Sequence, residues 1–353
     1  MSRYATRYDL LPDPRGPAHE FGEALGRLIA KRGYDLVIAT IDSTLARLAT
    51  VRIAVPTFPN VGPAFQALTD KASLADLCAT VNVPYPRTLA PRDDDETRDA
   101  TDELGLPAVV KSSRSAEAGP QVVSVAPGAH VCREREDVVV AARQLRAAGM
   151  RPIVQSRVRS VEKINAVVIR RHGAREYRYA HRVLRETPIS GGIGVALETI
   201  PADRGSGGEA ADLLERVCDA AAYSGLAQAE FYRSADDGRL YLLDVNPRLW
   251  GSTWFAERLG QRVVERGVRS ALDLAPLAPR PYRVSRRFHT PIGEWRWLRE
   301  RDSKIAGLIE LARSTRPCDV FEYVDGRDPA PLALYALLTL RPQLRGSNPG
   351  DGL

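Results

Sequence analysis

The chain lacks the features of a disulfide-bonded, zinc-binding or membrane-spanning protein. Its 353 residues include four cysteines, which lie far apart and form no C-x-x-C pair. This spacing favours reduced, buried thiols in a cytosolic protein over a disulfide framework or a zinc site. No apolar run approaches the length of a membrane span, and the N-terminal residues contain no apolar segment typical of a signal peptide. We therefore expect a cytoplasmic protein with no membrane partner.

A dominant charge of one sign is also lacking. The 50 basic and 44 acidic side chains give a formal net charge of +6, and the basic residues are mostly isolated arginines that form no stripe. This favours a solvated, arginine-rich surface over a nucleic-acid interface. The chain has no G-x-S-x-G motif, and none of its five histidines stands in the setting of a catalytic triad. We expect neither a nucleic-acid partner nor catalysis by an activated serine.

The length of the chain predicts more than one lobe, because 353 residues exceed what one hydrophobic core usually serves. In a first block, residues 1–90, helix and strand patterns alternate, which indicates a parallel α/β lobe. Asp70 is placed to cap a helix over residues 71–83, and Pro84 and Pro86 favour an extended chain after it.

Two further blocks follow. The second, residues 91–205, opens with an acidic stretch at 91–105 that indicates a linker. After it, strand patterns and a helix at 134–149 predict helices packed on an antiparallel sheet. The third block, residues 206–340, begins with an amphipathic helix and continues into a hydrophobic hairpin with a turn at S-A-D-D-G. Residues 341–353 indicate a loose tail.

The hydrophobic hairpin carries polar residues on one predicted face. Side chains alternate between the two faces of a strand, so Glu230 shares a face with Gln228, and Asp244 shares a face with Asn246. If the turn pairs these strands, two carboxylates and an amide converge. Converging carboxylates repel each other and are costly to bury unless a cation compensates them. Oxygen ligands without His or Cys suit Mg²⁺, which is often completed by substrate phosphates. The alternative is a solvent-facing hairpin with ordinary surface acids.

Four stretches in order resemble the ATP-grasp superfamily. The hairpin AEFYRSADDGRLYLLDVNPRLWGS is similar to the family's metal-binding end. LTDKASLADLCATVNVPYPRT resembles its Asp-Lys helix, LPAVVKSS its Pro-x-Val-x-Lys strand, and PIVQSRV the hinge strand beside the adenine. Among its members, the carboxylate–amine ligases with carbamoyl-phosphate-synthase-like cores are the most similar. The resemblance implies a mixed α/β and α+β fold. It would comprise a reduced N-terminal parallel lobe (1–90), a small antiparallel nucleotide lobe (91–205) and a C-terminal metal and substrate lobe (206–340).

The resemblance also implies roles for individual residues. The expected cofactors are ATP and Mg²⁺, with Mn²⁺ as a substitute. Arg248 would contact the γ-phosphate or the intermediate formed from it. The residues expected to bind the nucleotide are Lys71, Lys111, Ser112, Ser113, Gln155, Val158 and Glu162. The residues expected to bind the metal are Glu230, Asp244 and Asn246.

The sequence departs from the family pattern in four places. Asp244 stands where the family usually has Glu, which would shift the metal. The loop S-S-R-S-A-E-A-G has serines where relatives are often glycine-rich, although hydroxyl and N–H groups also bind phosphate. Gln155 replaces a common acid. Relatives usually begin with an additional strand, helix and strand, and the sequence shows no pattern for them. We therefore expect either a reduced first lobe or a translation start that lies further upstream.

Such a site predicts an ATP-dependent ligase that converts a carboxylate into an acyl phosphate, which an amine then attacks. Mg²⁺, lysine and arginine would disperse the charge on the transferred phosphoryl group. The expected partners are small-molecule carboxylate and amine substrates, and a homodimer is left open. A kinase or an acid–thiol ligase on the same scaffold, or a non-catalytic nucleotide-binding module, is the alternative.

Overall fold

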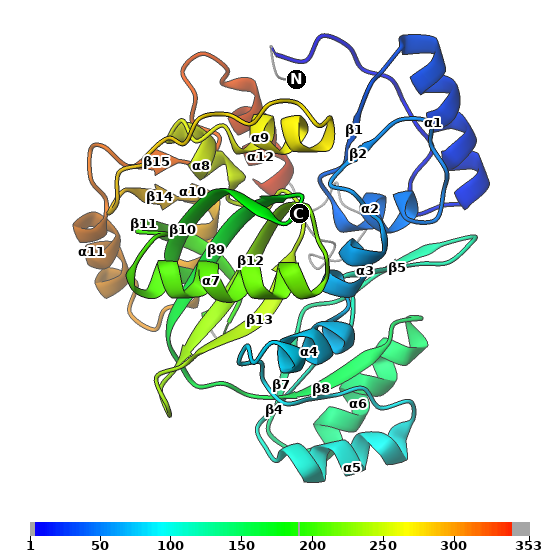
Figure 1. Ribbon diagram of the computed structural model, residues 1–353. Helices are drawn as coiled ribbons and strands as arrows, with labels where there is room; N and C mark the ends of the chain where they lie inside the picture. Colours follow the sequence, from blue (N-terminus) through cyan, green and yellow to red (C-terminus); the bar gives the residue numbers. More distant parts are fainter. Residues whose placement is uncertain (1–3, 190, 341–353) are drawn as a thin grey trace.

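A twisted sheet of seven strands forms the centre of the molecule (Figure 1). The structure, a computed structural model, describes residues 4–189 and 191–340. Five long antiparallel strands supply most of the sheet, and two short strands extend one edge. In spatial order the strands are β13 (Leu240–Asn246), β12 (Gly225–Ser234), β9 (Ser160–Arg171), β10 (Ala174–Thr187), β11 (Ile193–Ile200), β14 (Arg287–His289) and β15 (Val320–Phe321).

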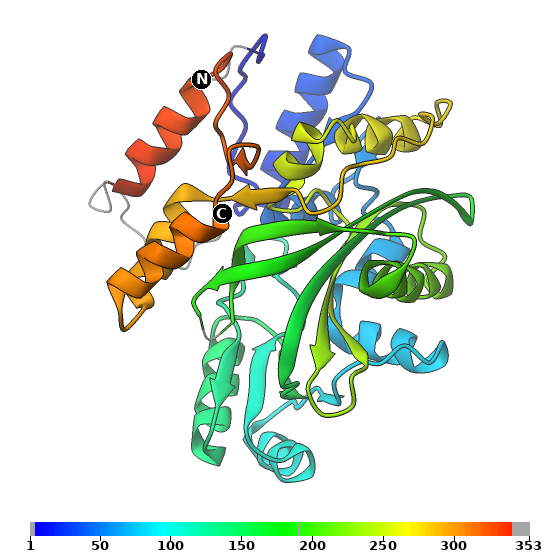
Figure 2. The ribbon, with the colours of Figure 1, turned by 90° about the vertical axis from the view of Figure 1, so that its left-hand side faces the viewer.

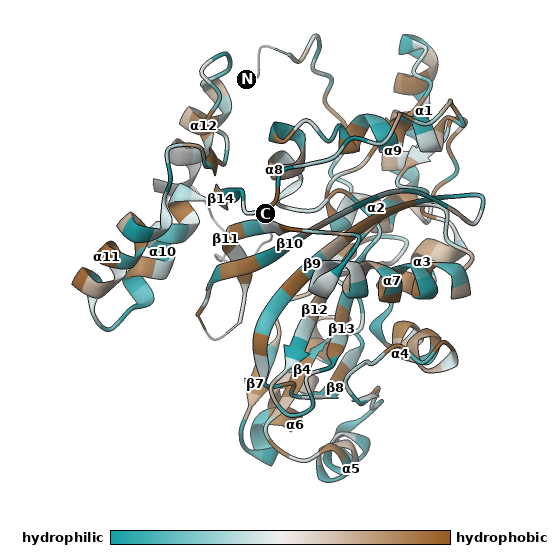
Figure 3. Ribbon diagram, turned by 60° about the vertical axis from the view of Figure 1, so that its left-hand side comes forward, coloured by the Kyte–Doolittle hydropathy of each residue, from teal (hydrophilic) through white to brown (hydrophobic). Residues whose placement is uncertain are grey.

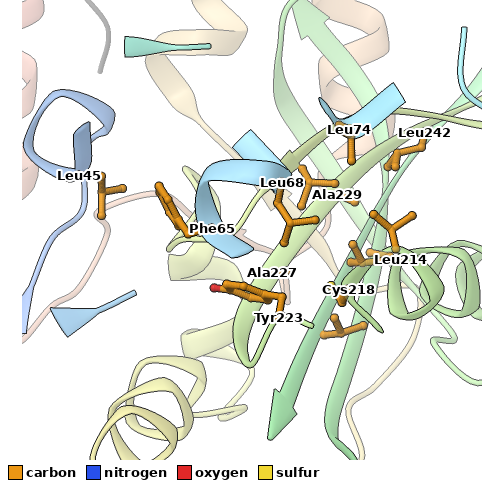
Figure 4. Close-up of a cluster of buried hydrophobic side chains, with 14 of the residues drawn as sticks. Leu45, Phe65, Leu68, Leu74, Leu214, Cys218, Tyr223, Ala227, Ala229 and Leu242 are labelled. Atoms are coloured by element: carbon orange, nitrogen blue, oxygen red, sulfur yellow. The ribbon is translucent and has the colours of Figure 1, made fainter. Parts of the chain in front are cut away.

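Both faces of this sheet are covered. Strand β9 is buried from Ile164 to Arg170, as a central strand packed on both sides must be, and hydrophobic residues follow it through the sheet (Figure 3). Helix α7 (Gly205–Ala220) lies along one face, and α3 (Pro63–Thr69) and α4 (Lys71–Thr80) also pack there. Leu68 and Leu74 of these two helices meet Leu214 and Cys218 of α7 over the alanines of β12 (Figure 4).

The opposite face and one end of the sheet are covered by C-terminal helices. Aromatic side chains of α8 (Thr253–Arg258) pack with Tyr179 of β10, and α9 (Val263–Ala271) lies beside them. Helices α10 (Pro291–Glu300) and α11 (Lys304–Ser314) lie on the side of the sheet away from α7 (Figure 2). Helix α12 (Ala330–Leu340) ends the described chain. Within residues 4–189 and 191–340, no helix has the length and hydrophobicity needed to cross a membrane. The expected tail, 341–353, lies outside the described residues.

A second, smaller sheet forms a separate layer with two helices. Its four antiparallel strands, in spatial order, are β3 (Thr88–Leu89), β8 (Pro152–Ser156), β4 (Ala108–Ser112) and β7 (His130–Cys132). Helices α5 (Asp94–Leu104) and α6 (Arg135–Ala147) cover it. The prediction that the acidic stretch 91–105 is a linker is therefore wrong, because most of it forms α5. Asp93 caps this helix through the N–H of Glu96, and acidic residues in a first turn favour the helix dipole.

The chain passes from the small sheet to the large one earlier than the sequence indicates. Strand β8 ends at Ser156 and β9 begins at Ser160, so residues 157–159 connect the two sheets. The sequence predicted this boundary near residue 205, before the amphipathic helix that opens the third block. No glycine or proline stands at 157–159 to signal the change.

The N-terminal lobe is small, as predicted. Strands β1 (Val37–Ile38) and β2 (Thr57–Phe58) form a two-stranded parallel sheet beside α1 (Ala18–Arg32) and α2 (Asp42–Leu48). A hairpin of β5 (Ala116–Ala118) and β6 (Val123–Val125) extends from the small sheet towards this lobe. Arg47, fully buried, joins them by donating to the carbonyls of Pro14, Gly16 and Gly119.

The buried carboxylate of Glu215 ties α7 to the sheet. It accepts from Arg175 and Arg178 of β10 at 2.7 to 2.9 Å. Burial raises the pKa of Glu215, but the hydrogen bonds from Arg178 and Arg175 outweigh it and lower the pKa to about 2. A lowered pKa means that the ionised form stabilises the fold above pH 4.5 and that this contribution disappears as the pH falls towards 2.

We expect Glu215→Gln to lower the free energy of unfolding at pH 7 by about 2 kcal/mol, because a charged hydrogen-bond acceptor is lost. The deficit should shrink between pH 4.5 and 2. Urea denaturation followed by circular dichroism measures both. Asp212→Asn, which removes a 64% exposed partner of Arg178, is the control and should cost less than about 0.5 kcal/mol. A deficit that stays constant with pH would contradict the role of the ionised carboxylate.

Candidate active site

The polar residues of the β12–β13 hairpin lie on one face, as their alternation predicted. Glu230 is paired directly with Asp244, and Gln228 with Asn246. The Asn246 amide donates to the Gln228 side-chain oxygen at 3.0 Å. Glu230 and Asp244 are 33% and 26% exposed, so their oxygens remain accessible to a ligand. The pairing therefore brings two carboxylates and two amides together at the edge of the large sheet.

A β-bulge at Leu243 interrupts the same hairpin. The register shifts between Glu230 and Phe231, so β13 carries one residue more than β12 at this point. The Leu243 carbonyl accepts from the ammonium of Lys111 at 3.4 Å. Lys111 lies in β4 of the small sheet, so this contact joins the two sheets across the site.

Three lysines surround the two carboxylates. Lys71 lies 3.3 Å from Asp244, and Lys163 lies 3.1 Å from Glu230. Burial, and to a lesser extent the nearby charge of Lys71, lower the pKa of Lys111 to about 8 against the opposing effect of Asp244 and Glu230. The site is therefore close to charge balance and combines carboxylates with cations able to bind phosphate.

Asp70 holds two of these elements together. As the N-cap of α4 it accepts from the N–H groups of Ala72 and Ser73, and it also accepts from the Ser113 hydroxyl at 2.7 Å. Arg114 donates to its second oxygen at 3.1 Å, and Arg151 also pairs with it. Burial raises the pKa of Asp70, but these hydrogen bonds outweigh it and lower the pKa. The carboxylate thus fixes Lys71, the first residue of α4, against the loop that follows Lys111.

Arg248 follows the hairpin and is paired with the N-terminal lobe. Its guanidinium donates to both oxygens of Asp42, at 2.6 and 3.0 Å. The pair lines a cavity of about 380 Å³ between α2, α3, the β5 strand and the end of β13. The predicted metal residues Asp244 and Asn246 line the same cavity.

Comparison with known proteins agrees with this arrangement. The profile described as ATP-grasp domain matches residues 76–256, just over half of the chain. The chain belongs to the ATP-grasp family. No curated protein sequence matches it.

Solved ATP-grasp-like structures show the same fold at low sequence identity. Biotin carboxylase from Campylobacter jejuni superposes with a TM-score of 0.59 and 14% identity, over 75% of this chain and 60% of that one. N5-carboxyaminoimidazole ribonucleotide synthetase from Thermus thermophilus gives 0.56 and 19%, over 74% and 67%. Carboxyaminoimidazole ribonucleotide synthase from Aspergillus clavatus, complexed with ATP, gives 0.59 and 17%, over 75% and 66%. The chain thus spans less than two thirds of the length of the biotin carboxylase.

The remaining residues expected to bind nucleotide lie in different environments of the ATP-grasp fold. Ser112 is buried at the end of β4, and its hydroxyl has no hydrogen-bond partner in the part of the chain that the structure describes. Gln155, in β8, donates to the Thr88 hydroxyl at 2.8 Å and is buried. Val158 is half-buried in the connection 157–159 between the two sheets. Because side chains alternate along β4, Ser112 lies on the same face as the buried Ala108 and Val110, opposite to Lys111.

Glu162 does not face the site, which corrects the expectation from the resemblance. It is paired with Arg233 in the strand register, and this pair lies on the α7 face of the sheet. Its carboxylate contacts Arg233 at 3.5 Å and the Ser206 hydroxyl at 3.4 Å. The adjacent Lys163 points the opposite way, because side chains alternate along β9. We therefore do not assign Glu162 to the nucleotide.

Lys163 was missed by the sequence reasoning. Its ammonium contacts Glu230, Glu186 and the Gly192 carbonyl at 2.9 to 3.4 Å. Burial lowers the pKa of Lys163, but the charges of Glu230 and Glu186 outweigh it and raise the pKa. A lysine directly before the buried run I-N-A-V-V-I of β9 was the available signal, since a buried charge is usually paired with an opposite one.

The donor set fits Mg²⁺ bound together with a nucleotide. Glu230 and Asp244 offer carboxylate oxygens, and Asn246 offers its side-chain amide oxygen. Oxygen ligands of this kind suit a hard cation. Over residues 4–189 and 191–340, no three His, Cys, Asp or Glu side chains converge at metal-binding spacing. Two carboxylates and an amide therefore form an incomplete set, which phosphate oxygens and water would complete. The residues fit the metal that the ATP-grasp fold implies.

Proposed function

We propose that this protein is an ATP-dependent ligase that activates a carboxylate as an acyl phosphate and couples it to an amine, releasing ADP and phosphate. The observation that carries the proposal is the direct pairing of Glu230 with Asp244 opposite Lys71 and Lys111. A site for a polyphosphate needs cations for the phosphates and anions for the metal, and here both meet between two sheets. The ATP-grasp family membership supports the same reading.

The residues divide the work as follows. Lys71 and Lys111 neutralise the phosphates, and the hydroxyl of Ser113 borders them. Gln155 and the backbone at Val158 border the adenine end. Mg²⁺, or Mn²⁺ in its place, is held by Glu230, Asp244 and Asn246, and when bound it withdraws charge from the phosphate oxygens.

Arg248 acts at the reacting end of this row. It follows Asn246 by two residues and lines the cavity beside the metal residues. A substrate carboxylate oxygen attacks the γ-phosphorus, the bond to the ADP oxygen breaks, and an acyl phosphate forms. The amine nitrogen then attacks the acyl carbon, loses a proton and expels phosphate. Arg248 stabilises the charge that develops on the transferred group.

Oxygen transfer tests the reaction type. The first step is a screen of carboxylates and amines for substrate-dependent release of ADP and phosphate. The carboxylate found is then labelled with ¹⁸O, and mass spectrometry of the phosphate should show one labelled oxygen per turnover, because the attacking oxygen leaves with the phosphoryl group.

Other outcomes would assign other activities. Label in AMP, with pyrophosphate released, would mean adenylation and would refute the proposal. A stable phosphorylated product would favour a kinase, and a requirement for a thiol in place of the amine would favour an acid–thiol ligase. ATP binding without turnover across the screen would favour a nucleotide-binding module.

A further inference from the structure

The cavity beside Arg248 is lined by charges that are already paired. Asp42 accepts from Nε and Nη2 of Arg248, and Nη1 donates to the Leu249 carbonyl. Asp244 is paired with Lys71, and Glu117 lies 3.9 Å from Arg114. Each charge on the cavity wall therefore has a counter-charge before any substrate enters.

This balance restricts the charge of a ligand that uses Arg248. A substrate carboxylate that pairs side-on with Nε and Nη2 must displace Asp42, because Asp42 occupies that edge of the guanidinium. Asp42 has no second cation partner within 4 Å in the described parts of the chain, and its side chain is 34% exposed. A lone carboxylate would thus leave a partly desolvated anion without a counter-charge, which is unfavourable. A substrate that also carries an ammonium group would compensate both residues at once.

Much of the remaining cavity wall is apolar. Its apolar part consists of Leu45 and Ala46 of α2, Ala49 directly after that helix, and Val61 and Phe65 from the region of α3. Uncharged polar residues, Thr50, Gln66, Thr69 and Ser115, line the remainder. A volume of about 380 Å³ is enough for a molecule of amino-acid size in addition to the transferred group. The wall therefore suits a ligand with an ionic end and an apolar side group.

We propose that the carboxylate substrate is a zwitterion of the amino-acid type with an apolar side group, and that Asp42 is the residue that selects it. In the free protein Asp42 holds Arg248. When the substrate binds, Arg248 takes its carboxylate and Asp42 takes its ammonium, so one ion pair becomes two. This inference rests on the proposed function, since it concerns the acid that the ligase activates.

The test compares matched ligands that differ only in charge. Isothermal titration calorimetry in the presence of Mg²⁺ and AMP-PNP would measure binding of L-leucine, 4-methylpentanoate and 3-methylbutylamine, and of L-phenylalanine, 3-phenylpropionate and 2-phenylethylamine. We expect at least one amino acid to bind about tenfold or more tightly than its two singly charged counterparts.

Variants of Asp42 test whether this residue causes the preference for a zwitterion. Asp42→Asn should weaken amino-acid binding by about tenfold or more, while Asp42→Glu should retain the preference for the zwitterion. Asp35→Asn, an exposed carboxylate of the same lobe, makes the same charge change and should leave amino-acid binding as in the wild type. Circular dichroism shows whether each variant is folded. The comparison of amino acids with their singly charged counterparts uses the wild-type protein, so it remains valid even if a variant fails to fold.

Three results would overturn the inference: equal affinity for an amino acid and its deaminated acid, unchanged amino-acid binding in Asp42→Asn, or no binding by any compound of the panel. The affinity for Mg²⁺ and AMP-PNP is measured in the same samples. Its absence would refute the proposed function itself, whereas nucleotide binding without amino-acid selectivity would refute only the role of Asp42.

Discussion

Glu230→Gln is expected to lower ATP-dependent turnover by about a thousandfold while the fold survives. The change keeps the size of the side chain but removes the charge that faces Asp244 across the hairpin. A neutral amide is a weaker ligand for a divalent cation, and the charge on the transferred phosphoryl group is then less well dispersed. Release of ADP with the substrates identified by screening, together with circular dichroism, measures the effect.

The control separates metal binding from the ion pair with Lys163. Lys163 contacts Glu186 as well as Glu230, at 3.4 and 3.1 Å. Glu186→Gln disturbs the same lysine but leaves Glu230, Asp244 and Asn246 intact, so it should cost no more than about tenfold. If both variants lose activity equally, Glu230 acts through Lys163 and the metal assignment is wrong. Full activity in a folded Glu230→Gln variant would also refute it.

Lys111→Ala is expected to weaken AMP-PNP binding by about a hundredfold. The lysine is half-buried between the sheets, where a charge-assisted contact to phosphate is stronger than at the surface. Lys111→Arg should restore little of the affinity, because the guanidinium is a planar fork in a space that holds a compact ammonium against the Leu243 carbonyl. Calorimetry with AMP-PNP and Mg²⁺ measures both variants.

Lys31→Ala is the matched control, since Lys31 is exposed on α1. It removes the same charge from the N-terminal lobe, outside the two sheets that form the site, and should leave the dissociation constant within about twofold. Unchanged affinity in Lys111→Ala would mean that its ammonium serves only to join the two sheets.

The local periodicity of the sequence was enough to predict the hairpin. A period of two places Glu230 with Gln228 and Asp244 with Asn246, whatever surrounds the strands. The bulge at Leu243 could not be predicted, because the pattern does not reveal an extra residue between the turn and Asp244. It did not alter the outcome, since it lies between the turn and both polar residues of β13.

Long-range partners were not predictable in the same way. The pairing of Arg248 with Asp42 joins residues 206 positions apart, and no local pattern connects them. The orientation of Glu162 depended on where β9 begins, and a shift of one residue reverses every side chain of a strand. The resemblance predicted which segment of the chain lies near the nucleotide, but it did not predict the register of β9 that decides the face on which Glu162 lies.

The hydrogen bonds of Arg47, which join the N-terminal lobe to the β5–β6 hairpin, restrict how the hairpin can move. The β5–β6 hairpin follows the loop after Lys111, yet its backbone is held by the N-terminal segment. Val123 donates to the Arg15 carbonyl, and Ala18 donates to the Pro120 carbonyl, each at 2.9 Å. The hairpin would therefore travel with the N-terminal lobe and not swing as a free flap. Ser113 and Arg114, at the start of the hairpin, are held to Asp70 as well. A movement that separates the small sheet from the large one would therefore strain hydrogen bonds at both ends of this hairpin.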